Sequence, residues 1–300
     1  MKSDGRLSVA VLGAGLIGVD LAIKIIRSDA LDLRLVAGRD VAAPGLRQLA
    51  RLGVPVAADG VRSLLATEEP FDVVFDATNA AAHAEHAERL VPLGTKLVDL
   101  TPSKAGHLVV PTVNGADVTG RHDIADISMV TCGGQASIPV LHAIARAYPI
   151  DYIEVVTTAA TLSVGRGTRL NLDEYVETTQ DAIRDFTGVE NVKALLNISP
   201  ARPPATFRVS MSLLGRGLEA GVVSALAATA VSEMRPFVRG VDVMACTVND
   251  GRAFVAVEVT SSGDRIPSYA GNLDIINSAA LTVAELYAAH RPAIAGAETS

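Results

Sequence analysis

The chain has 300 residues, of which 49% are hydrophobic and 20% are charged, and its formal net charge is −7. This length fits one large domain or two of ordinary size, and the acidic balance without a Lys/Arg cluster argues against a nucleic-acid partner. No apolar stretch is long enough to span a membrane, and the first six residues show no signal-peptide pattern. With only two cysteines, we expect a cytoplasmic protein without a disulfide framework.

The first half of the sequence alternates strand-like and helix-like segments. Apolar runs predict strands at residues 8–12, 33–37, 71–75 and 96–100, and helical apolar spacing predicts helices at residues 19–27, 43–52 and 80–90. This alternation indicates a parallel sheet that is covered by helices on both faces.

The pattern changes after residue 131. Val- and Thr-rich runs predict longer strands at residues 153–162, 205–213, 242–248 and 253–261, and we expect helices at residues 136–147, 172–186 and 220–233. Long strands with fewer helices are typical of an α+β domain on a largely antiparallel or mixed sheet. We expect a last helix, which begins at residue 273, to return to the first domain.

A glycine-rich segment follows the first predicted strand and opens the first predicted helix. Strand, glycines and helix in this order are the context of a dinucleotide-binding fingerprint, with the phosphates at the helix N-terminus. The first glycine permits a tight turn, the second lets the backbone approach the pyrophosphate, and the third lets the helix pack closely on the strand. The segment reads Gly13, Ala14, Gly15, Leu16, Ile17 and Gly18.

Polar residues also follow the second and third predicted strands. Asp40 would bind the adenosine ribose of NAD, whereas Arg39 could pair with the 2′-phosphate of NADP, so both cofactors stay open. Thr78 and Asn79 lie at the sheet edge where cofactors bind in such folds. Because Asn79 directly precedes a predicted helix, we interpret it as the N-cap of that helix.

Cys132 stands between a short apolar strand and the helix predicted at residues 136–147. Unpaired amides and the helix dipole at such a position favour the thiolate, which is the reactive nucleophile. The following Gly133 and Gly134 let a substrate approach closely. On spacing alone, a buried and inert cysteine fits equally well. We expect Cys246, in an apolar strand-like run, to lie in the core.

A second glycine-punctuated segment lies between a predicted strand and a predicted helix. It is polar and basic, and its amides and two arginines could bind a phosphate of a dinucleotide or of coenzyme A. The alternative interpretation is a surface turn. The segment consists of Ser163, Val164, Gly165, Arg166, Gly167, Thr168, Arg169, Leu170 and Asn171.

The histidines do not suggest a metal site. His83 and His86 lie three residues apart on one predicted helix with no third ligand in register, so we expect a solvated helix face there. His142 lies ten residues beyond Cys132, about three helical turns away, which makes it a poor general base for that thiol.

A nucleotide fingerprint together with a Thr-Cys-Gly-Gly segment points to aldehyde or acyl oxidoreduction. In these features the sequence resembles the acylating acetaldehyde dehydrogenases that partner 4-hydroxy-2-oxovalerate aldolases. The likeness runs from the fingerprint to near the C-terminus. Its most specific segments are residues 129–136, 167–169, 171–174, 177–179 and 269–275.

The resemblance implies an α/β chain with two domains. A Rossmann dinucleotide-binding domain would span residues 1–131, with a C-terminal helix within residues 273–300 returning to it, and an α+β catalytic and dimerisation domain would span residues 132–272. Residues 14–17, 163–171 and Asn272 would line the cofactor site. The resemblance further implies a homodimer, NAD or NADP as cofactor, coenzyme A as co-substrate and an aldolase as partner.

The same resemblance assigns the chemistry to Cys132. The thiolate would form a thiohemiacetal with an aldehyde, hydride would pass to the nicotinamide, and coenzyme A would attack the remaining thioester. Backbone amides after the cysteine are candidate oxyanion donors. The alternatives are a reductase of another activated acid, such as an acyl phosphate, and a catalytically impaired interaction subunit of an aldolase complex.

The sequence departs from the family pattern at three positions. Arg166 replaces a proline in the basic loop, and Arg39 replaces an isoleucine after the second strand, which keeps NADP open. Val209 stands where the family has an acidic residue that is thought to assist the cysteine. We hypothesise that this valine enlarges an apolar pocket for an acyl group larger than acetyl.

Overall fold

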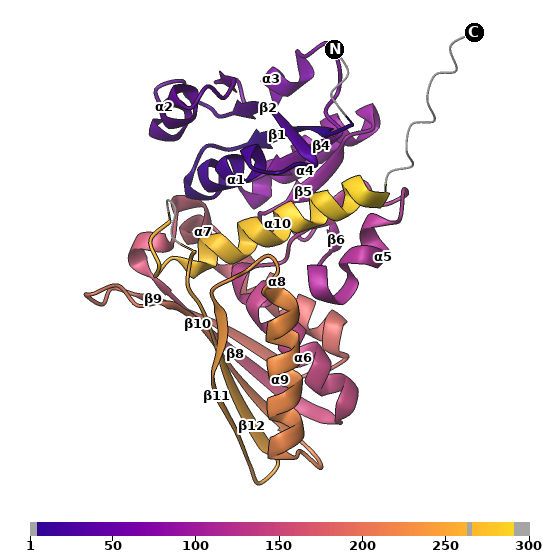
Figure 1. Cartoon of the computed structure of the whole chain (residues 1–300), viewed down its shortest axis with the longest axis vertical. Helices are drawn as coiled ribbons and strands as arrows, with labels where there is room; N and C mark the ends of the chain where they lie inside the picture. Colours follow the sequence, from indigo (N-terminus) through magenta and orange to yellow (C-terminus); the bar gives the residue numbers. More distant parts are fainter. Residues whose placement is uncertain (1–4, 263–265, 291–300) are drawn as a thin grey trace.

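A computed structural model describes residues 5–262 and 266–290, apart from the side chain of Arg166. A seven-stranded sheet and its helices form the upper part of Figure 1, and a five-stranded sheet with helices beside it forms the lower part. The predicted boundary between residues 131 and 132 falls between the two sheets, after β7 (Asp126–Ser128) and before β8 (Ile150–Ala160).

The N-terminal sheet is parallel, with strand order β3-β2-β1-β4-β5-β7-β6. Val9 and Val11 of β1 enter one hydrophobic cluster, whereas Ala10 and Leu12 enter another. Because successive side chains of a strand point to opposite faces, both faces of this sheet are covered, as a Rossmann fold requires. The strands before β7 are β1 (Leu7–Leu12), β2 (Leu31–Ala37), β3 (Val56–Ala57), β4 (Val73–Asp76), β5 (Lys96–Asp99) and β6 (His107–Leu108).

Short helices connect these strands. The predicted helices after β1, β2 and β4 are present, and two shorter ones were not predicted because they span only five and four residues. The connecting helices are α1 (Leu16–Ile26), α2 (Pro44–Arg51), α3 (Val61–Leu65), α4 (Ala80–Leu90) and α5 (Ala116–Thr119), with the short turns η1 (Val91–Leu93) and η2 (Pro111–Gly115).

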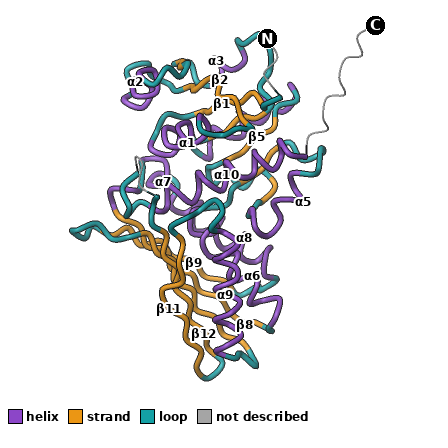
Figure 2. Tube along the Cα trace, viewed as in Figure 1, coloured by secondary structure: helices purple, strands orange, loops and turns teal. Residues whose placement is uncertain are grey.

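The second sheet has the order β11-β12-β10-β8-β9 and is mixed, since β8 and β9 are parallel and the other pairs are antiparallel. Figure 1 shows helices along one of its faces, and Figure 2 shows the long strands that form the other. Its other strands are β9 (Val192–Ser199), β10 (Phe207–Gly215), β11 (Val241–Asn249) and β12 (Arg252–Val259), and its helices are α6 (Cys132–Ala147), α7 (Arg166–Leu170), α8 (Leu172–Thr187) and α9 (Ala220–Met234), with η3 (Thr161–Ser163) before α7.

Helix α10 (Gly271–His290) returns to the N-terminal domain, where it lies beside α1 (Figure 1). The Asn277 amide donates hydrogen bonds to the Ile17 carbonyl at 3.2 Å and to Asp20 at 2.7 Å. Ser28 donates to Glu285 at 2.6 Å near the other end. The rest of the predicted C-terminal segment, residues 291–300, lies outside the described residues.

Two differences from the expected elements bear on the site. The helix after Cys132 begins at that residue rather than at residue 136, because the Thr131 side chain caps it. Strand β9 was not predicted, since it buries only alternate residues at its start and its second half is half-exposed. Within the described part of the chain, no helix is long and apolar enough to cross a membrane.

Candidate active site

One cavity of about 490 Å³ lies between the two sheets and contacts both domains. It runs from the end of β2, past the glycine-rich segment, to the start of α6 and to α7 and α10. A concave site where two domains meet is a common position for a cofactor and a substrate. The sequence-predicted residues that line it are Gly13, Ala14, Gly15, Leu16, Ile17, Arg39, Asp40, Thr78, Asn79, Cys132, Gly165, Gly167, Thr168, Asn171 and Asn272.

The glycine-rich segment has the geometry that its sequence predicts. Gly13 has φ +98°, and a Cβ there would lie 2.5 Å from the Ala77 carbonyl oxygen. Gly18 is buried and does not line the cavity. A Cβ on Gly18 would overlap the carbonyl of Gly13. Gly15 is the N-cap of α1, and a Cβ there would meet open space. The backbone is therefore approachable at the N-terminus of an eleven-residue helix.

Arg39 and Asp40 are both exposed and both line the cavity at the end of β2. The Asp40 carboxylate accepts a hydrogen bond from the Ala42 amide at 2.8 Å. No hydrogen bond or ion pair of Arg39 is found with any described residue. Of the two charged groups at the end of β2, the Arg39 guanidinium is therefore the one without a hydrogen-bond partner in the described part of the chain.

Asn79 caps α4, as predicted, since its side-chain oxygen accepts from the Ala82 amide at 3.2 Å. Thr78 donates its hydroxyl to Asp76 at 2.5 Å, and its amide donates to the same oxygen at 3.0 Å. Asp76 is completely buried at the end of β4. This carboxylate therefore determines the shape of the loop that follows the strand and lines the cavity.

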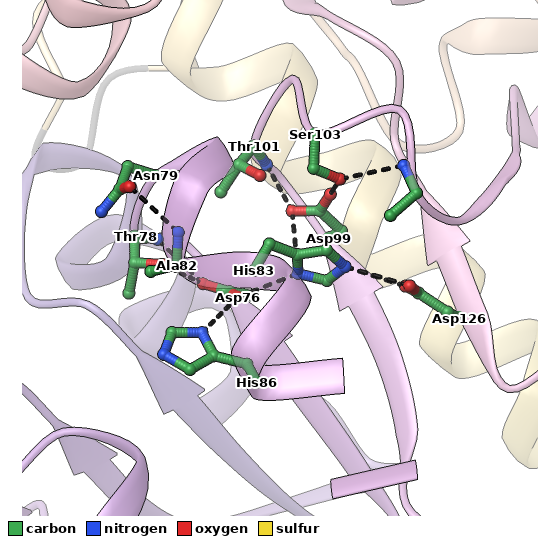
Figure 3. Close-up of polar contacts among 11 residues, drawn as sticks. Asp76, Thr78, Asn79, Ala82, His83, His86, Asp99, Thr101, Ser103 and Asp126 are labelled. Carbon is green, nitrogen blue, oxygen red and sulfur yellow. Dashed lines mark hydrogen bonds and ion pairs between the residues drawn. The ribbon is translucent and has the colours of Figure 1, made fainter. Parts of the chain in front are cut away.

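The expectation of a solvated face for His83 and His86 is wrong. His83 is fully buried and His86 is 7% exposed. As Figure 3 shows, the His83 ring lies among carboxylates: its Nδ1 is 3.0 Å from Asp76 and its Nε2 is 3.0 Å from Asp126. Nδ1 of His86 contacts Asp76 at 2.7 Å. The sequence of α4 does not reveal these contacts, because the acidic partners lie outside this helix, on β4 and β7.

We call this group, together with Asp99, the His83 cluster. Burial alone would lower the pKa of His83, but hydrogen bonds to Asp126 and Asp76 raise it to about 10. Burial raises the pKa of Asp99 to about 7 against the effect of the nearby His83 charge. Burial would also raise the pKa of Asp76, yet hydrogen bonds from His83 and His86 hold it well below its usual range. The cluster therefore pairs a protonated histidine with ionised carboxylate.

The ligand atoms of Asp76, His83 and Asp99 lie within 4.8 Å of one another, a spacing that could suit a metal ion. Both nitrogens of His83 already face carboxylates at hydrogen-bond distance. Asp99 is engaged as well, since it accepts from the Thr101 amide at 2.7 Å and from the Ser103 hydroxyl at 2.5 Å. These contacts account for the cluster without a cation.

Cys132 is the first residue of α6, is half-buried and lines the cavity. Thr131 caps the helix by accepting from the Gly134 amide at 3.0 Å. The hydroxyl of Tyr175, on α8, lies 3.4 Å from the Cys132 sulfur and accepts from the Gly133 amide at 3.0 Å. Cys132 thus has the predicted place at a helix N-terminus and a phenol neighbour that was not predicted.

The expected preference of this cysteine for the thiolate needs correction. Burial raises the pKa of the Cys132 thiol, while the hydrogen bonds with Tyr175 and with the backbone amide of Gly133 lower it by less. Desolvation disfavours the charged sulfur, and this effect outweighs the favourable helix terminus. The sequence could not show the degree of burial, which depends on packing from α8.

Val130 precedes this helix with φ +60° and is 1% exposed. A β-branched residue rarely adopts that conformation, which costs about 1–3 kcal/mol and persists only where the surroundings enforce it. Gln135 contributes to that enforcement, because its amide donates to the carbonyls of Met129 at 2.7 Å and Val109 at 2.8 Å. Strain of this kind concentrates at functional sites.

The basic loop reaches the cavity through only some of its residues. Ser163 is buried and donates to the Ala160 carbonyl at 3.0 Å. Arg169 binds its own loop, donating to the carbonyls of Val164 at 3.1 Å and Thr161 at 2.9 Å. The Arg169 guanidinium is thus engaged by its own loop and is not among the residues that line the cavity. Val164 and the exposed Leu170 also lie outside the lining, and the Arg166 side chain lies outside the described residues.

Asn272 joins the C-terminal helix to this loop. Its amide nitrogen donates to the Ser163 carbonyl at 2.9 Å, whereas its buried oxygen has no hydrogen-bond partner among the described residues. Asn272 is 7% exposed and lines the cavity. A buried unpartnered acceptor is costly unless a ligand or water satisfies it, so this oxygen is available to a hydrogen-bond donor in the cavity.

Three other predicted positions lie away from the cavity lining. His142 hydrogen-bonds to the Phe186 carbonyl at 2.7 Å, not to the cysteine. Cys246 is half-buried, packs against the core and hydrogen-bonds with Ser224. Val209 is fully buried in the same core and is not among the lining residues. Tyr175 is one of the lining residues that the sequence did not single out, and it is the one hydrogen-bonded to Cys132. An aromatic residue on a helix usually indicates core packing, so its position in the sequence gave no signal.

Comparisons with known proteins agree with this arrangement. The family model described as prokaryotic acetaldehyde dehydrogenase, dimerisation, matches residues 132–267. An acetaldehyde dehydrogenase of Streptomyces griseus is 50% identical over 282 residues, covering 94% of this chain and 90% of the relative. Those of Pectobacterium atrosepticum and Geobacillus stearothermophilus are 38% and 40% identical, and each match covers 95% of this chain and 97% of the relative.

Solved structures with the same fold are more distant in sequence. Aspartate semialdehyde dehydrogenase II of Vibrio cholerae, complexed with ASA, has a TM-score of 0.65 at 16% identity, covering 94% of this chain and 98% of that chain. The Candida albicans enzyme with NADP has the same TM-score and coverage at 13% identity. The close relatives carry the assignment: this chain belongs to the acetaldehyde dehydrogenase family and is an oxidoreductase of that type.

Proposed function

We propose that this protein is a coenzyme-A-acylating aldehyde dehydrogenase. It would interconvert an aldehyde, coenzyme A and NAD(P)+ with an acyl-CoA and NAD(P)H through a thioester on Cys132. The observation that carries the proposal is that Cys132, the glycine-rich segment and Asn272 all line the same cavity. The relatives named acetaldehyde dehydrogenase support a short aldehyde as substrate.

The residues present fit a nicotinamide dinucleotide, which would supply the hydride acceptor. The open backbone at Gly15 and the N-terminus of α1 suit its pyrophosphate. The unpartnered buried oxygen of Asn272 suits an amide donor such as a carboxamide. Asp76 orders Thr78 through two hydrogen bonds and so keeps the loop beside the cavity in place.

Cys132 would act as the nucleophile. Its sulfur would form a bond to the aldehyde carbon as the carbonyl electron pair moves to oxygen. That pair would then re-form the carbonyl as the carbon gives up its hydride, for which the dinucleotide would be the acceptor, and the thioester would remain. The thiolate of coenzyme A then attacks the carbonyl carbon, the bond to Cys132 breaks, and its electron pair returns to the sulfur. The strained Val130 backbone and the Thr131 cap hold the cysteine at the helix terminus.

The choice between NAD and NADP rests on the two charges after β2. Asp40 already accepts an amide hydrogen bond, whereas Arg39 makes no hydrogen bond or ion pair with any described residue and is available to a 2′-phosphate. We expect Arg39→Ala to raise the KM for NADPH by roughly tenfold, since a charge-assisted hydrogen bond contributes about 1.5–3 kcal/mol, and to change the KM for NADH little. Equal effects on both cofactors would remove Arg39 from this role.

Coenzyme A is proposed from the family resemblance and from the cavity-lining part of the basic loop, Gly165, Gly167 and Thr168. A reductase of an acyl phosphate would use the same cysteine and the same fold. Reduction of an acyl-CoA by NAD(P)H with release of free coenzyme A supports the proposal. Turnover of an acyl phosphate with no reaction of any acyl-CoA contradicts it.

The hypothesis of an acyl group larger than acetyl gains no support from Val209, because that side chain is buried away from the cavity lining. The size of the acyl group therefore stays a prediction. Initial rates with acetyl-, propionyl-, isobutyryl- and benzoyl-CoA, each with NADH and NADPH, would measure it. A preference for acetyl-CoA over every larger substrate would reject the larger acyl group while leaving the acylating reaction in place.

A homodimer is proposed for the second domain, which the dimerisation family model matches. The face of the second sheet opposite the helices exposes apolar side chains that a partner copy would cover. Analytical ultracentrifugation of Phe254→Glu should show a shift from dimer to monomer, whereas Glu258→Gln should stay dimeric. The exposed apolar residues on the strands of this face are Leu195, Leu214, Met244 and Phe254.

The aldolase partner and the cytoplasmic setting stay predictions.

A further inference from the structure

The hydroxyl of Tyr175 is hydrogen-bonded to the sulfur of the proposed nucleophile. It lies 3.4 Å from the Cys132 sulfur, and no other described side chain is hydrogen-bonded to that sulfur. Tyr175 is 5% exposed and lines the cavity beside the cysteine. A reacting carbonyl bound at the sulfur would therefore also lie close to this hydroxyl.

The hydrogen bonds around Tyr175 leave its proton for the sulfur. The Gly133 amide donates to the phenol oxygen at 3.0 Å, so that oxygen is already an acceptor. The Thr157 hydroxyl is a second hydrogen-bond partner, and this bond lowers the pKa of Tyr175. A threonine hydroxyl can donate or accept a hydrogen bond, whereas a negatively charged sulfur can only accept one, so a thiolate at Cys132 calls for the phenol proton.

The phenol stays protonated over the working pH range. Burial, followed by the charge of Cys132, raises the pKa of Tyr175 well above its ordinary value of 10.0. A hydroxyl with so high a pKa donates a hydrogen bond but does not remove a proton from the thiol. Its contribution at Cys132 is therefore stabilisation of negative charge on sulfur, which partly offsets the effect of burial on that thiol.

The chain positions this hydroxyl through contacts between α6 and α8. Thr179 donates to the Tyr175 carbonyl at 2.7 Å, and its hydroxyl lies 2.8 Å from that of Thr131. A Cβ at Gly133 would lie 2.6 Å from the phenol oxygen and would overlap Thr157. The glycine thus permits the approach of Tyr175, and the threonine pair connects the helix cap to the turn of α8 that carries the phenol.

No carboxylate replaces the phenol in this region among the described residues. Val209 stands at the position where the family resemblance implies an acidic residue. It lies on β10 opposite Thr157 of β8 and is fully buried. Apart from Thr157, it packs among apolar side chains of the core. The polar contact to the cysteine therefore comes from α8, and Thr157 hydrogen-bonds to the same phenol.

We propose that Tyr175 is a catalytic residue that donates a hydrogen bond to the sulfur of Cys132 whenever that sulfur is negatively charged. This inference rests on the proposed function. Before addition to the carbonyl, the phenol stabilises the thiolate. When coenzyme A attacks the thioester, the carbon–sulfur bond breaks, the electron pair returns to the sulfur, and the phenol again stabilises the leaving thiolate. Tyr175 keeps its own proton throughout.

The first test measures the reactivity of Cys132 in a Cys246→Ala background, where it is the only thiol of a chain with two cysteines. The rate of iodoacetamide alkylation against pH gives the thiol pKa. Tyr175→Phe should raise that pKa, slow alkylation at pH 8 by roughly tenfold and lower kcat by roughly tenfold to a hundredfold. The matched control is Tyr152→Phe, whose hydroxyl contacts Glu154 at 3.1 Å on β8; it should change none of these.

A second measurement avoids any change of side-chain shape. Biosynthetic replacement of the five tyrosines by 3-fluorotyrosine makes each phenol a stronger hydrogen-bond donor, and it should lower the alkylation pKa of Cys132. The Tyr175→Phe protein, fluorinated in the same way, should not respond. Thermal unfolding and dinucleotide binding establish that each protein is folded.

The outcomes separate this inference from the proposed function. An unchanged alkylation pKa in folded Tyr175→Phe, together with no response to fluorination, would overturn the role of Tyr175 even if Cys132→Ala is inactive. Full activity of Cys132→Ala would instead overturn the cysteine mechanism itself. A raised pKa with the expected loss of kcat in Tyr175→Phe, and an inactive Cys132→Ala, support both.

Discussion

Two polar groups of side chains are built in opposite ways, one that meets the cavity only through His86 and one that opens onto it. In the His83 cluster, the histidine faces a carboxylate at each nitrogen, and Asp76 accepts from His83, His86 and Thr78 (Figure 3). At the start of α6, Cys132 has one side-chain partner among the described residues, Tyr175, and opens onto the cavity. Charges that satisfy one another hold the backbone in place, whereas a nucleophile with one weak partner remains free to react.

The largest effect should follow from Cys132→Ala, because it removes the nucleophile rather than a supporting group. We expect turnover to fall by at least about a thousandfold, measured as NADH formation from aldehyde and coenzyme A. Cys246→Ala is the matched control, since that thiol packs on the core and hydrogen-bonds with Ser224. Comparable losses in both variants would indicate instability rather than chemistry.

Gly133→Ala tests whether the close approach of Tyr175 matters. The new Cβ would lie 2.6 Å from the phenol oxygen, so we expect the phenol to move, kcat to fall by about tenfold and stability to fall by about 1–3 kcal/mol. Gly221→Ala, where a Cβ meets open space in α9, should leave activity unchanged. If both glycine variants keep full activity, the geometry around the sulfur is not limiting.

His83→Gln tests the other side of the comparison, with stability as its main effect. Leaving buried carboxylate without its cation should lower the free energy of unfolding by about 3–5 kcal/mol, with a smaller effect on kcat. Urea unfolding measures it, and the exposed His107→Gln is the control. A loss of turnover as large as that of Cys132→Ala, in a stable protein, would make the His83 cluster part of the chemistry.

The same variant has a pH signature. Because the pKa of His83 rises from 6.5 to about 10 on folding, its stabilisation is fully present below pH 6.5 and is lost as the pH rises towards 10. The difference in unfolding free energy between the wild type and His83→Gln should therefore shrink over that window. A constant difference would mean that His83 is neutral in the folded protein.

Asp99→Asn should have the smallest effect. The pKa of Asp99 rises from 3.8 to about 7 on folding, so the protonated carboxyl is favoured in the folded state and its advantage is lost as the pH rises from 3.8 to 7. Relative to Asp99→Asn, which cannot ionise, the wild type should lose stability across that window and level off above it. A relative stability that rises with pH instead would show that Asp99 is ionised in the cluster.

Local sequence patterns predicted the parts of the site that depend on near neighbours in the chain. The turn at Gly13, the packing at Gly18, the Asn79 cap and the place of Cys132 at a helix start all follow from a few adjacent residues. Each of them depends on backbone conformation or on hydrogen bonds within one turn. The βαβ rhythm predicted the parallel sheet for the same reason.

What the sequence by itself determined is therefore the Rossmann half, the mixed sheet that follows it, and the nucleophile at a helix start. Only the tertiary structure decided which groups surround that nucleophile and which carboxylates surround His83. Tyr175 is 43 residues from Cys132, and Asp126 is 43 residues from His83, so no local pattern connects them. Desolvation by such distant neighbours raises the pKa of both Cys132 and Asp99, and that effect exists only once the chain is packed.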